Sequence, residues 1–199
     1  MKFYSILLCL LLSSNSYAQK FNGYVITDQN VKINGHLTLL KDAQGKKISV
    51  NDGKSYFVRT FYIHDLKSYA YKKDTFMVLP AFYPFGSDYL AEDVVAEVRI
   101  SKGKLKLYYG ELPDFYPYTY TTVPTGSPNG VGVTAHKKRC FTYIIQDDES
   151  LYGVQKGDDF IKSISIPLAD NEILMKRIKN KELKYKDMVE IITLYNAGH

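Results

Sequence analysis

Residues 94–109 read VVAEVRISKGKLKLYY, and this stretch decides the fold class. Two runs rich in β-branched and aromatic residues, 94–101 and 104–109, are separated by Lys102-Gly103. Such runs on either side of a short turn with glycine are typical of a β-hairpin. In residues 105–109 apolar and polar side chains alternate, which predicts a strand with one buried face and one face in water. The stretch therefore predicts antiparallel β-sheet.

The same pattern extends in both directions from this hairpin. Phe21–Thr27 and residues 31–40 predict two strands joined by a turn at Asp28-Gln29-Asn30. Glycine, asparagine, aspartate and proline separate the other strand-like runs. These runs cover residues 47–50, 56–63, 67–71, 75–79, 139–146, Leu151–Val154 and 160–164.

Residues 111–138 interrupt the pattern with four prolines and three glycines. Proline removes a backbone donor and fixes φ, so a long regular element is disfavoured there. We expect a long excursion between two strands over this range.

The last 30 residues change to a helical period. Asp170 is the expected N-cap of a first short helix, and Asn180-Lys181 its stop. Asp187 is the expected start of a second, with Glu190 three residues on as a variant of the capping box. The predicted fold is mainly β, an antiparallel sheet or meander with sandwich-like and barrel-like arrangements left open. A C-terminal helical pair at about 170–196 makes it α+β by count, in a single domain over residues 19–199.

Residues 1–18 have the three parts of a secretory signal peptide. Lys2 is basic, residues 6–12 are a seven-residue apolar run, and Ser16-Tyr17-Ala18 is a small-x-small cleavage site. A short buried helix is the alternative, and Cys9 raises a lipoprotein alternative that Leu8 disfavours. The run is far below the roughly 20 apolar residues of a membrane-spanning helix. We expect cleavage after Ala18 and export to the periplasm or the cell exterior.

The composition of the predicted mature chain is that of an ordinary globular domain. Removing residues 1–18 leaves 181 residues with 25 basic and 21 acidic side chains, a net charge of +4. This balance is mild and scattered, so nucleic-acid binding is not expected, and no further transmembrane segment is visible. Cys140 remains as the one cysteine, which predicts no intrachain disulfide and a thiol that serves as a small buried side chain.

Motifs for catalysis or cofactors are not found in the sequence. The four histidines have no zinc-ligand spacing, and no nucleophile elbow, dinucleotide fingerprint or phosphate loop is present. His64-Asp65 is interpreted as a turn, and the acidic runs at 147–149 and 158–159 as solvated turns. We therefore expect no enzyme activity, no cofactor and no metal. The alternative is a hydrolase with a carboxylate pair drawn from Asp74, Glu92, Asp93, Glu97 and Glu111.

Aromatic residues gather next to prolines at 82–85 and 115–120. Amphipathic rings on loops are common in recognition surfaces, because they add contact area at low entropic cost. Tyr116, Tyr118 and Tyr120 are the candidate ligand-binding residues, as a platform for a glycan, a peptide or a protein partner. The alternative is that these rings cover the sheet and fill a core that lacks tryptophan.

Short motifs along most of the mature chain resemble small secreted proteins of the Bacteroidetes. These motifs are Gly23-Tyr24-Val25-Ile26, Asn34-Gly35-His36-Leu37, residues 63–69, residues 103–108, and Tyr185-Lys186-Asp187 with the residues that follow it. The chain departs from the pattern at Asp28-Gln29-Asn30, where the family has Gly-Asp-Thr. The resemblance implies export and a β-rich fold with a helical end, and it supplies no catalytic residue.

Together these features lead us to expect an exported, non-enzymatic envelope protein that acts as a binding or interaction module. A glycan or small ligand held by the loop tyrosines is the alternative within binding. Docking of an envelope protein through the 111–138 excursion or through an exposed sheet edge is a second class of function.

Overall fold

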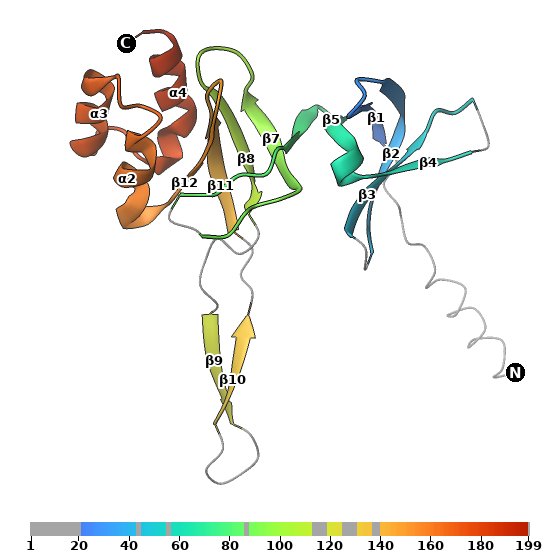
Figure 1. Cartoon of the computed structure of the whole chain (residues 1–199), viewed down its shortest axis with the longest axis horizontal. Helices are drawn as coiled ribbons and strands as arrows, with labels where there is room; N and C mark the ends of the chain where they lie inside the picture. Colours follow the sequence, from blue (N-terminus) through green and yellow to red (C-terminus); the bar gives the residue numbers. More distant parts are fainter. Residues whose placement is uncertain are drawn as a thin grey trace, which may run out of the picture.

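The computed structural model describes residues 21–42, 45–54, 57–85, 88–112, 119–124, 131–136 and 140–198. Its main feature is one antiparallel sheet of ten strands in the order β12-β11-β8-β7-β6-β5-β1-β2-β3-β4. The sheet is open, with β12 and β4 at its edges (Figure 1). The predicted antiparallel, mainly β fold is confirmed, and of the arrangements left open the chain adopts an unclosed sheet.

The strands follow the order of the chain with one exception, because β1 pairs with both β2 and β5. The strands of the sheet are β1 (Phe21–Thr27), β2 (Lys32–Asp42), β3 (Gly45–Asn51), β4 (Arg59–Tyr62), β5 (Leu66–Tyr71), β6 (Asp74–Leu79), β7 (Val94–Ile100), β8 (Lys106–Leu112), β11 (Cys140–Gln146) and β12 (Leu151–Val154). The hairpin predicted over residues 94–109 is formed by β7 and β8, with a bulge between Val98 and Ile100.

The turn between β1 and β2 is also as predicted. Asn30 donates its backbone N–H to the Thr27 carbonyl at 3.0 Å. Its φ of +64° lies in the left-handed region, which asparagine tolerates better than most residues.

The prediction of a water-facing side on β8 was wrong. Leu107 faces one apolar cluster and Tyr108 faces another, on the opposite side of the sheet. The second cluster includes Phe82 and Ala91, which form a bridge in the connection from β6 to β7. Tyr108 can be buried because its hydroxyl reaches the Gln146 side chain at 2.7 Å. Both faces of this half of the sheet are therefore covered.

Three helices pack at one end of the sheet (Figure 1): α2 (Phe160–Ser165), α3 (Glu172–Lys179) and α4 (Met188–Asn196). They bury an apolar cluster against β7, β8, β11 and β12. Short 3-10 turns complete the described elements: η1 (Ile63–Asp65), η2 (Gly157–Asp159) and η3 (Tyr185–Asp187). The expected C-terminal helical pair corresponds to α3 and α4.

Residues 160–164 were predicted as a strand and instead belong to α2. Phe160 and Ile164, four residues apart, are both buried, as is Ser163. That spacing places them on one side of a helix. A short apolar run does not distinguish a strand from a buried helix by its period, and this is where the prediction failed.

The two predicted helix caps differ in detail from the structure. Asn171, not Asp170, caps α3, and its side chain accepts the Leu174 N–H at 2.9 Å. Asp187 does precede α4, but its carboxylate accepts the backbone N–H of Lys184 at 2.9 Å and not one from the helix. The capping variant predicted from Glu190 was therefore wrong, because the 3-10 turn η3 takes the carboxylate instead.

The 111–138 excursion contains regular structure that its prolines and glycines led us not to expect. Strands β9 (Thr119–Pro124) and β10 (Val131–His136) pair antiparallel as a separate two-stranded sheet. Pro124 lies at a strand end, a position where its missing N–H is tolerated. The hairpin projects away from the main sheet below β8 and β11 (Figure 1).

Candidate functional site

The main sheet curls strongly between β8 and β3. Five strands separate these two in the sheet order, yet Lys46 Nζ of β3 lies 3.9 Å from Glu111 Oε2 of β8. In a flat sheet with about 4.8 Å between strands, the two would be about 29 Å apart. The chain therefore encloses a space inside the curl.

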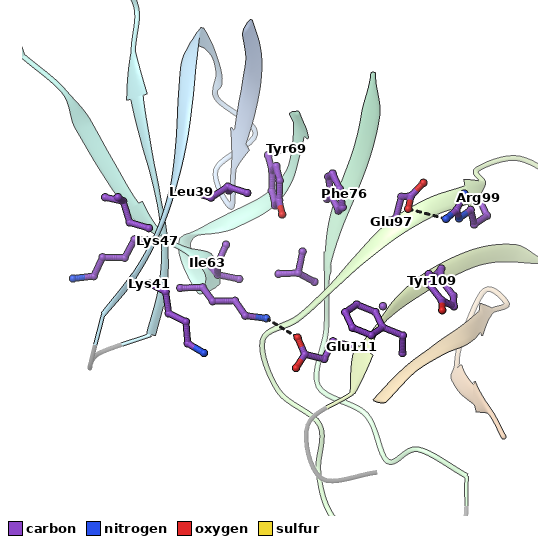
Figure 2. Close-up of a pocket in the computed structure, with 15 residues that line it drawn as sticks. Leu39, Lys41, Lys47, Ile63, Tyr69, Phe76, Glu97, Arg99, Tyr109 and Glu111 are labelled. Atoms are coloured by element: carbon purple, nitrogen blue, oxygen red, sulfur yellow. Dashed lines mark ion pairs between the residues drawn. The ribbon is translucent and has the colours of Figure 1, made fainter. Parts of the chain in front are cut away.

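This space is a groove of about 440 Å³, here called the sheet groove (Figure 2). Its lining comes from the β2–β3 hairpin, from η1 and the centre of the sheet, and from β7, β8 and the start of β11. The lining residues are Leu39, Leu40, Lys41, Lys46, Lys47, Ile63, Tyr69, Phe76, Val95, Glu97, Arg99, Tyr109, Gly110, Glu111 and Phe141.

The floor of the sheet groove follows a row of cross-strand partners. Tyr69 pairs with Phe76, Phe76 with Glu97, and Glu97 with Tyr109. Residues directly opposite on neighbouring strands point to the same face, so this row runs across four strands. The rings of Tyr69 and Phe76 stack at 4.9 Å with 13° between their planes. Burial, with a smaller contribution from Tyr71, raises the pKa of Tyr69 to about 12, so its phenol stays neutral.

Charged side chains surround this apolar floor and are largely paired. Arg99 contacts the Glu97 carboxylate at 2.9 Å, and its guanidinium lies 5.6 Å from the centre of the Tyr109 ring. Lys46 and Glu111 pair across the groove, as Figure 2 shows. Lys47, on the same hairpin, lies 4.4 Å from the centre of the Tyr62 ring.

A chain of aromatic rings separates the groove from the helical layer. Tyr109 contacts Phe141 at 6.0 Å and Tyr143 at 5.0 Å between ring centres. Tyr143 in turn contacts Tyr185 at 5.2 Å, and Tyr185 contacts Phe160 at 5.9 Å. The Tyr185 hydroxyl accepts the backbone N–H of Tyr143 at 3.3 Å, which fixes this ring at the edge of the helices. The groove thus ends where the helical layer begins.

The tyrosines predicted as ligand-binding lie elsewhere in the chain. Tyr116 and Tyr118 fall outside the described residues. Tyr120 is on β9, opposite Ala135, and its side chain is outside the described part. Their role stays a prediction. In the other aromatic segment, Phe82 is buried against the sheet whereas Tyr83 is exposed.

The structure brings together two of the five carboxylates considered for a hydrolase. Glu97 and Glu111 both line the sheet groove, and each has a cation beside it. Asp93 lies away from the groove and faces His64, with 4.0 Å between Asp93 Oδ2 and His64 Nδ1. Asp74 and Glu92 do not line the groove.

The His64-Asp65 pair forms a turn, as the sequence analysis interpreted it. Both residues are in η1, where Asp65 Oδ2 accepts the Tyr62 N–H at 3.2 Å. The two side chains are 3.6 Å apart, because a 3-10 turn does not alternate its side chains as a strand does. His64 stacks on the Tyr62 ring at 5.3 Å and is mostly exposed.

The acidic run at 147–149 also holds a turn. Asp147 Oδ1 accepts backbone N–H groups from Glu149 at 2.9 Å and from Ser150 at 2.6 Å. Burial acts to raise the Asp147 pKa, but these bonds and one from Tyr152 outweigh it, so the pKa is lowered. Across the part of the chain that the structure describes, no group of three or more His, Cys, Asp or Glu side chains could hold a metal ion.

The groove residues Tyr69, Phe76 and Tyr109 were not singled out from the sequence. Each lies in a predicted strand, and the alternation of residues gives a face, but strand order decides which faces meet. Among the described residues, no helix is long and apolar enough to cross a membrane.

Comparisons with known proteins add no relative from which a function could be transferred. No family model matches the sequence, and neither a curated protein nor a solved structure matches the chain. The function is therefore argued from the sheet groove itself, and the resemblance to secreted Bacteroidetes proteins stays an expectation.

Proposed function

We propose that this protein is an exported, non-enzymatic binding module that takes a small apolar or amphipathic ligand in the sheet groove. One observation carries the proposal. On a single face of the sheet, the apolar row is buried under helices at one end and left uncovered in the groove at the other. Export rests on the signal peptide predicted for residues 1–18, which lie outside the described residues.

The size and chemistry of the groove support a ligand site. Its volume of about 440 Å³ falls within the roughly 300–1,000 Å³ of typical small-molecule sites, which are mainly apolar with a few polar groups. Leu39 and Phe141 at its walls are 47% and 54% exposed, which is high for large apolar side chains. A ligand that covered them would gain hydrophobic stabilisation of about 25 cal/mol per Å² of buried apolar area.

The ion pairs in the groove favour binding over hydrolysis. A glycosidase needs two carboxylates whose roles are acid and nucleophile or base. Glu97 is paired with Arg99 and Glu111 with Lys46, so both carboxylates are engaged by neighbouring cations. This arrangement supports a structural use of the two side chains at the rim.

A thermal-shift screen of the purified protein tests the proposal, with decanol among a set of apolar and amphipathic probes. A ligand at about a hundred times its dissociation constant stabilises the fold by roughly 2.7 kcal/mol, which is on the order of 5–10 °C here. Phe141→Ala is expected to reduce the shift, because it removes a groove wall. Tyr83→Ala, an exposed aromatic outside the groove, is the matched control. A flat screen, or a shift equal in both variants, contradicts the proposal.

The β9–β10 hairpin favours a second candidate, docking of a partner chain. In the described chain its two strands pair only with each other, and they contain no Lys, Arg, Asp or Glu. Natural edge strands are usually protected by charge, and a lone two-stranded ribbon is marginal in water. A partner strand added to either edge would satisfy both conditions.

Excision of residues 113–138 tests this candidate. Leu112 and Cys140 are paired neighbours on β8 and β11, so a short turn can join them. We expect the main sheet to stay folded and crosslinking to its envelope partner to be lost. Unchanged crosslinking would contradict a docking role. Replacing Tyr116, Tyr118 and Tyr120 together by alanine tests the glycan alternative, which predicts loss of glycan binding without unfolding.

A further inference from the structure

We infer that the ligand of the sheet groove is a single-chain amphipathic anion, with its apolar chain along the floor and its charged head at the lysines of the β2–β3 hairpin. This inference rests on the proposed function of the groove as a ligand site. It adds the chemical class of the ligand and the direction in which it lies.

The balance of charge around the groove points to an anion. Four cations line it, Lys41, Lys46, Lys47 and Arg99, against two carboxylates, Glu97 and Glu111. The two carboxylates are matched by Lys46 at 3.9 Å and by Arg99 at 2.9 Å. The lining therefore has a net charge of +2, which an anionic head would offset.

The positive charge is concentrated at one end of the groove. Lys41 and Lys47 are both on the β2–β3 hairpin, opposite the end formed by Glu97 and Arg99 (Figure 2). Among the described residues Lys41 has no ion-pair partner. A lysine ammonium is a compact charge on a flexible stem, so it can follow a carboxylate or a phosphate head without fixed geometry.

The apolar part of the ligand is indicated by the floor. Ile63, Tyr69 and Phe76 form an apolar surface between the two charged ends. The Tyr69 phenol remains neutral well above physiological pH, so it adds no charge under an apolar chain. Charge at one end and an apolar floor along the rest match a molecule with one anionic head and one hydrocarbon chain.

Calorimetric titration with four probes of one chain length tests the inference: decanoate, decyl phosphate, decanol and decyltrimethylammonium, each kept below its micelle concentration. We expect decanoate and decyl phosphate to bind at least about fivefold more tightly than decanol, and the cation to bind most weakly. Whichever anion binds more tightly identifies the head group. Raising the salt concentration should weaken binding of the anions and leave decanol unchanged, because partly exposed charges are screened.

The double variant Lys41→Gln/Lys47→Gln should weaken decanoate binding by roughly fivefold, the loss expected for two partly exposed ion pairs, and change decanol binding less than twofold. Lys162→Gln, which removes an exposed lysine on α2, is the matched control. The salt series on the unchanged protein gives the same information without a variant.

Two negative results have different meanings. If none of the four probes binds, the proposed function itself is overturned. If decanol binds as tightly as decanoate, or the cation binds best, the groove is a ligand site but the inference about an anion is overturned.

Discussion

The two ends of one sheet face have opposite environments. On β11, Ile145 is fully buried beneath α2 and α4, whereas Phe141, four residues earlier on the same face, is 54% exposed in the sheet groove. On β8, Leu107 lies under the helices and Tyr109 and Glu111 line the groove. The strands continue from one region into the other without a break, so the backbone does not cause the difference.

Side-chain chemistry follows the helical cover. Aliphatic residues fill the covered region, where packing against helices stabilises the fold. Aromatic residues and ion pairs replace them where the helices end, at the rings of Tyr109, Tyr143 and Tyr185. Aromatic side chains with a polar group tolerate partial exposure better than aliphatic ones. The contrast indicates that one sheet face serves stability at one end and recognition at the other.

The largest effect is expected from a matched pair of substitutions on β11. Ile145→Ala should lower the free energy of unfolding by about 2–5 kcal/mol, because it leaves a cavity in a closed core. Phe141→Ala should lower it by less than about 1 kcal/mol, because the ring is already half exposed. Chemical denaturation of both variants measures the difference. Similar losses at the two positions would mean that the groove wall is part of the core.

An intermediate effect is expected where α4 is attached to the sheet. The Asn196 side chain accepts the Leu105 N–H at 2.9 Å and donates to the Leu105 carbonyl at 2.8 Å. Asn196→Ala should cost about 1–2 kcal/mol, since it leaves both backbone groups without this partner. Hydrogen exchange should show faster exchange in α4 and in the turn after β7, with little change at β1–β3. Uniform acceleration would show that the helical layer and the curled half do not open separately.

These two predictions depend on the structure to different degrees. The β7–β8 hairpin, the β1–β2 turn and the helical end could be predicted, because each is encoded by neighbouring residues. The cross-strand row from Tyr69 to Tyr109 could not, because strands distant in sequence meet only after the sheet has formed and curled.

Local ambiguity explains the other differences. Residues 160–164 are apolar enough for a strand or a helix, and contact with the sheet decides for α2. Of the carboxylates considered beforehand, Glu97 and Glu111 were correctly included among residues that could meet. Their pairing with Arg99 and Lys46 requires the three-dimensional arrangement, because Lys46 is 65 residues from Glu111 in the chain.

A small effect is expected from the ion pair across the groove. Lys46→Gln should change the free energy of unfolding by less than about 1 kcal/mol, because both partners are partly exposed. The pair joins the two walls of the groove, so its loss should increase hydrogen exchange at the β2–β3 hairpin. Lys162→Gln, whose lysine pairs with Asp159 on the helical side, serves as the control. A large loss of stability from Lys46→Gln would show that the curl depends on this one contact.

The smallest effect is expected at acid pH in the covered region. Lys104, together with the Tyr195 hydroxyl at 2.8 Å, lowers the pKa of Asp170 below its ordinary value of 3.8. A carboxyl group with a lowered folded-state pKa contributes stability above its unfolded pKa, and loses that contribution as the pH falls through the folded value. Stability should therefore decrease below about pH 3.8. Thermal melts of Asp170→Asn should show a shallower acid decline; an unchanged slope would contradict a role for this contact.

The most direct test of the account is to map where a neutral probe binds. Two-dimensional NMR of the protein titrated with decanol should show shift changes at Tyr69, Phe76, Glu97 and Tyr109 in the sheet groove, and none on α3. Changes confined to the helical layer or to the β9–β10 hairpin, or no change at all, would contradict a division of the sheet face into a core end and a binding end.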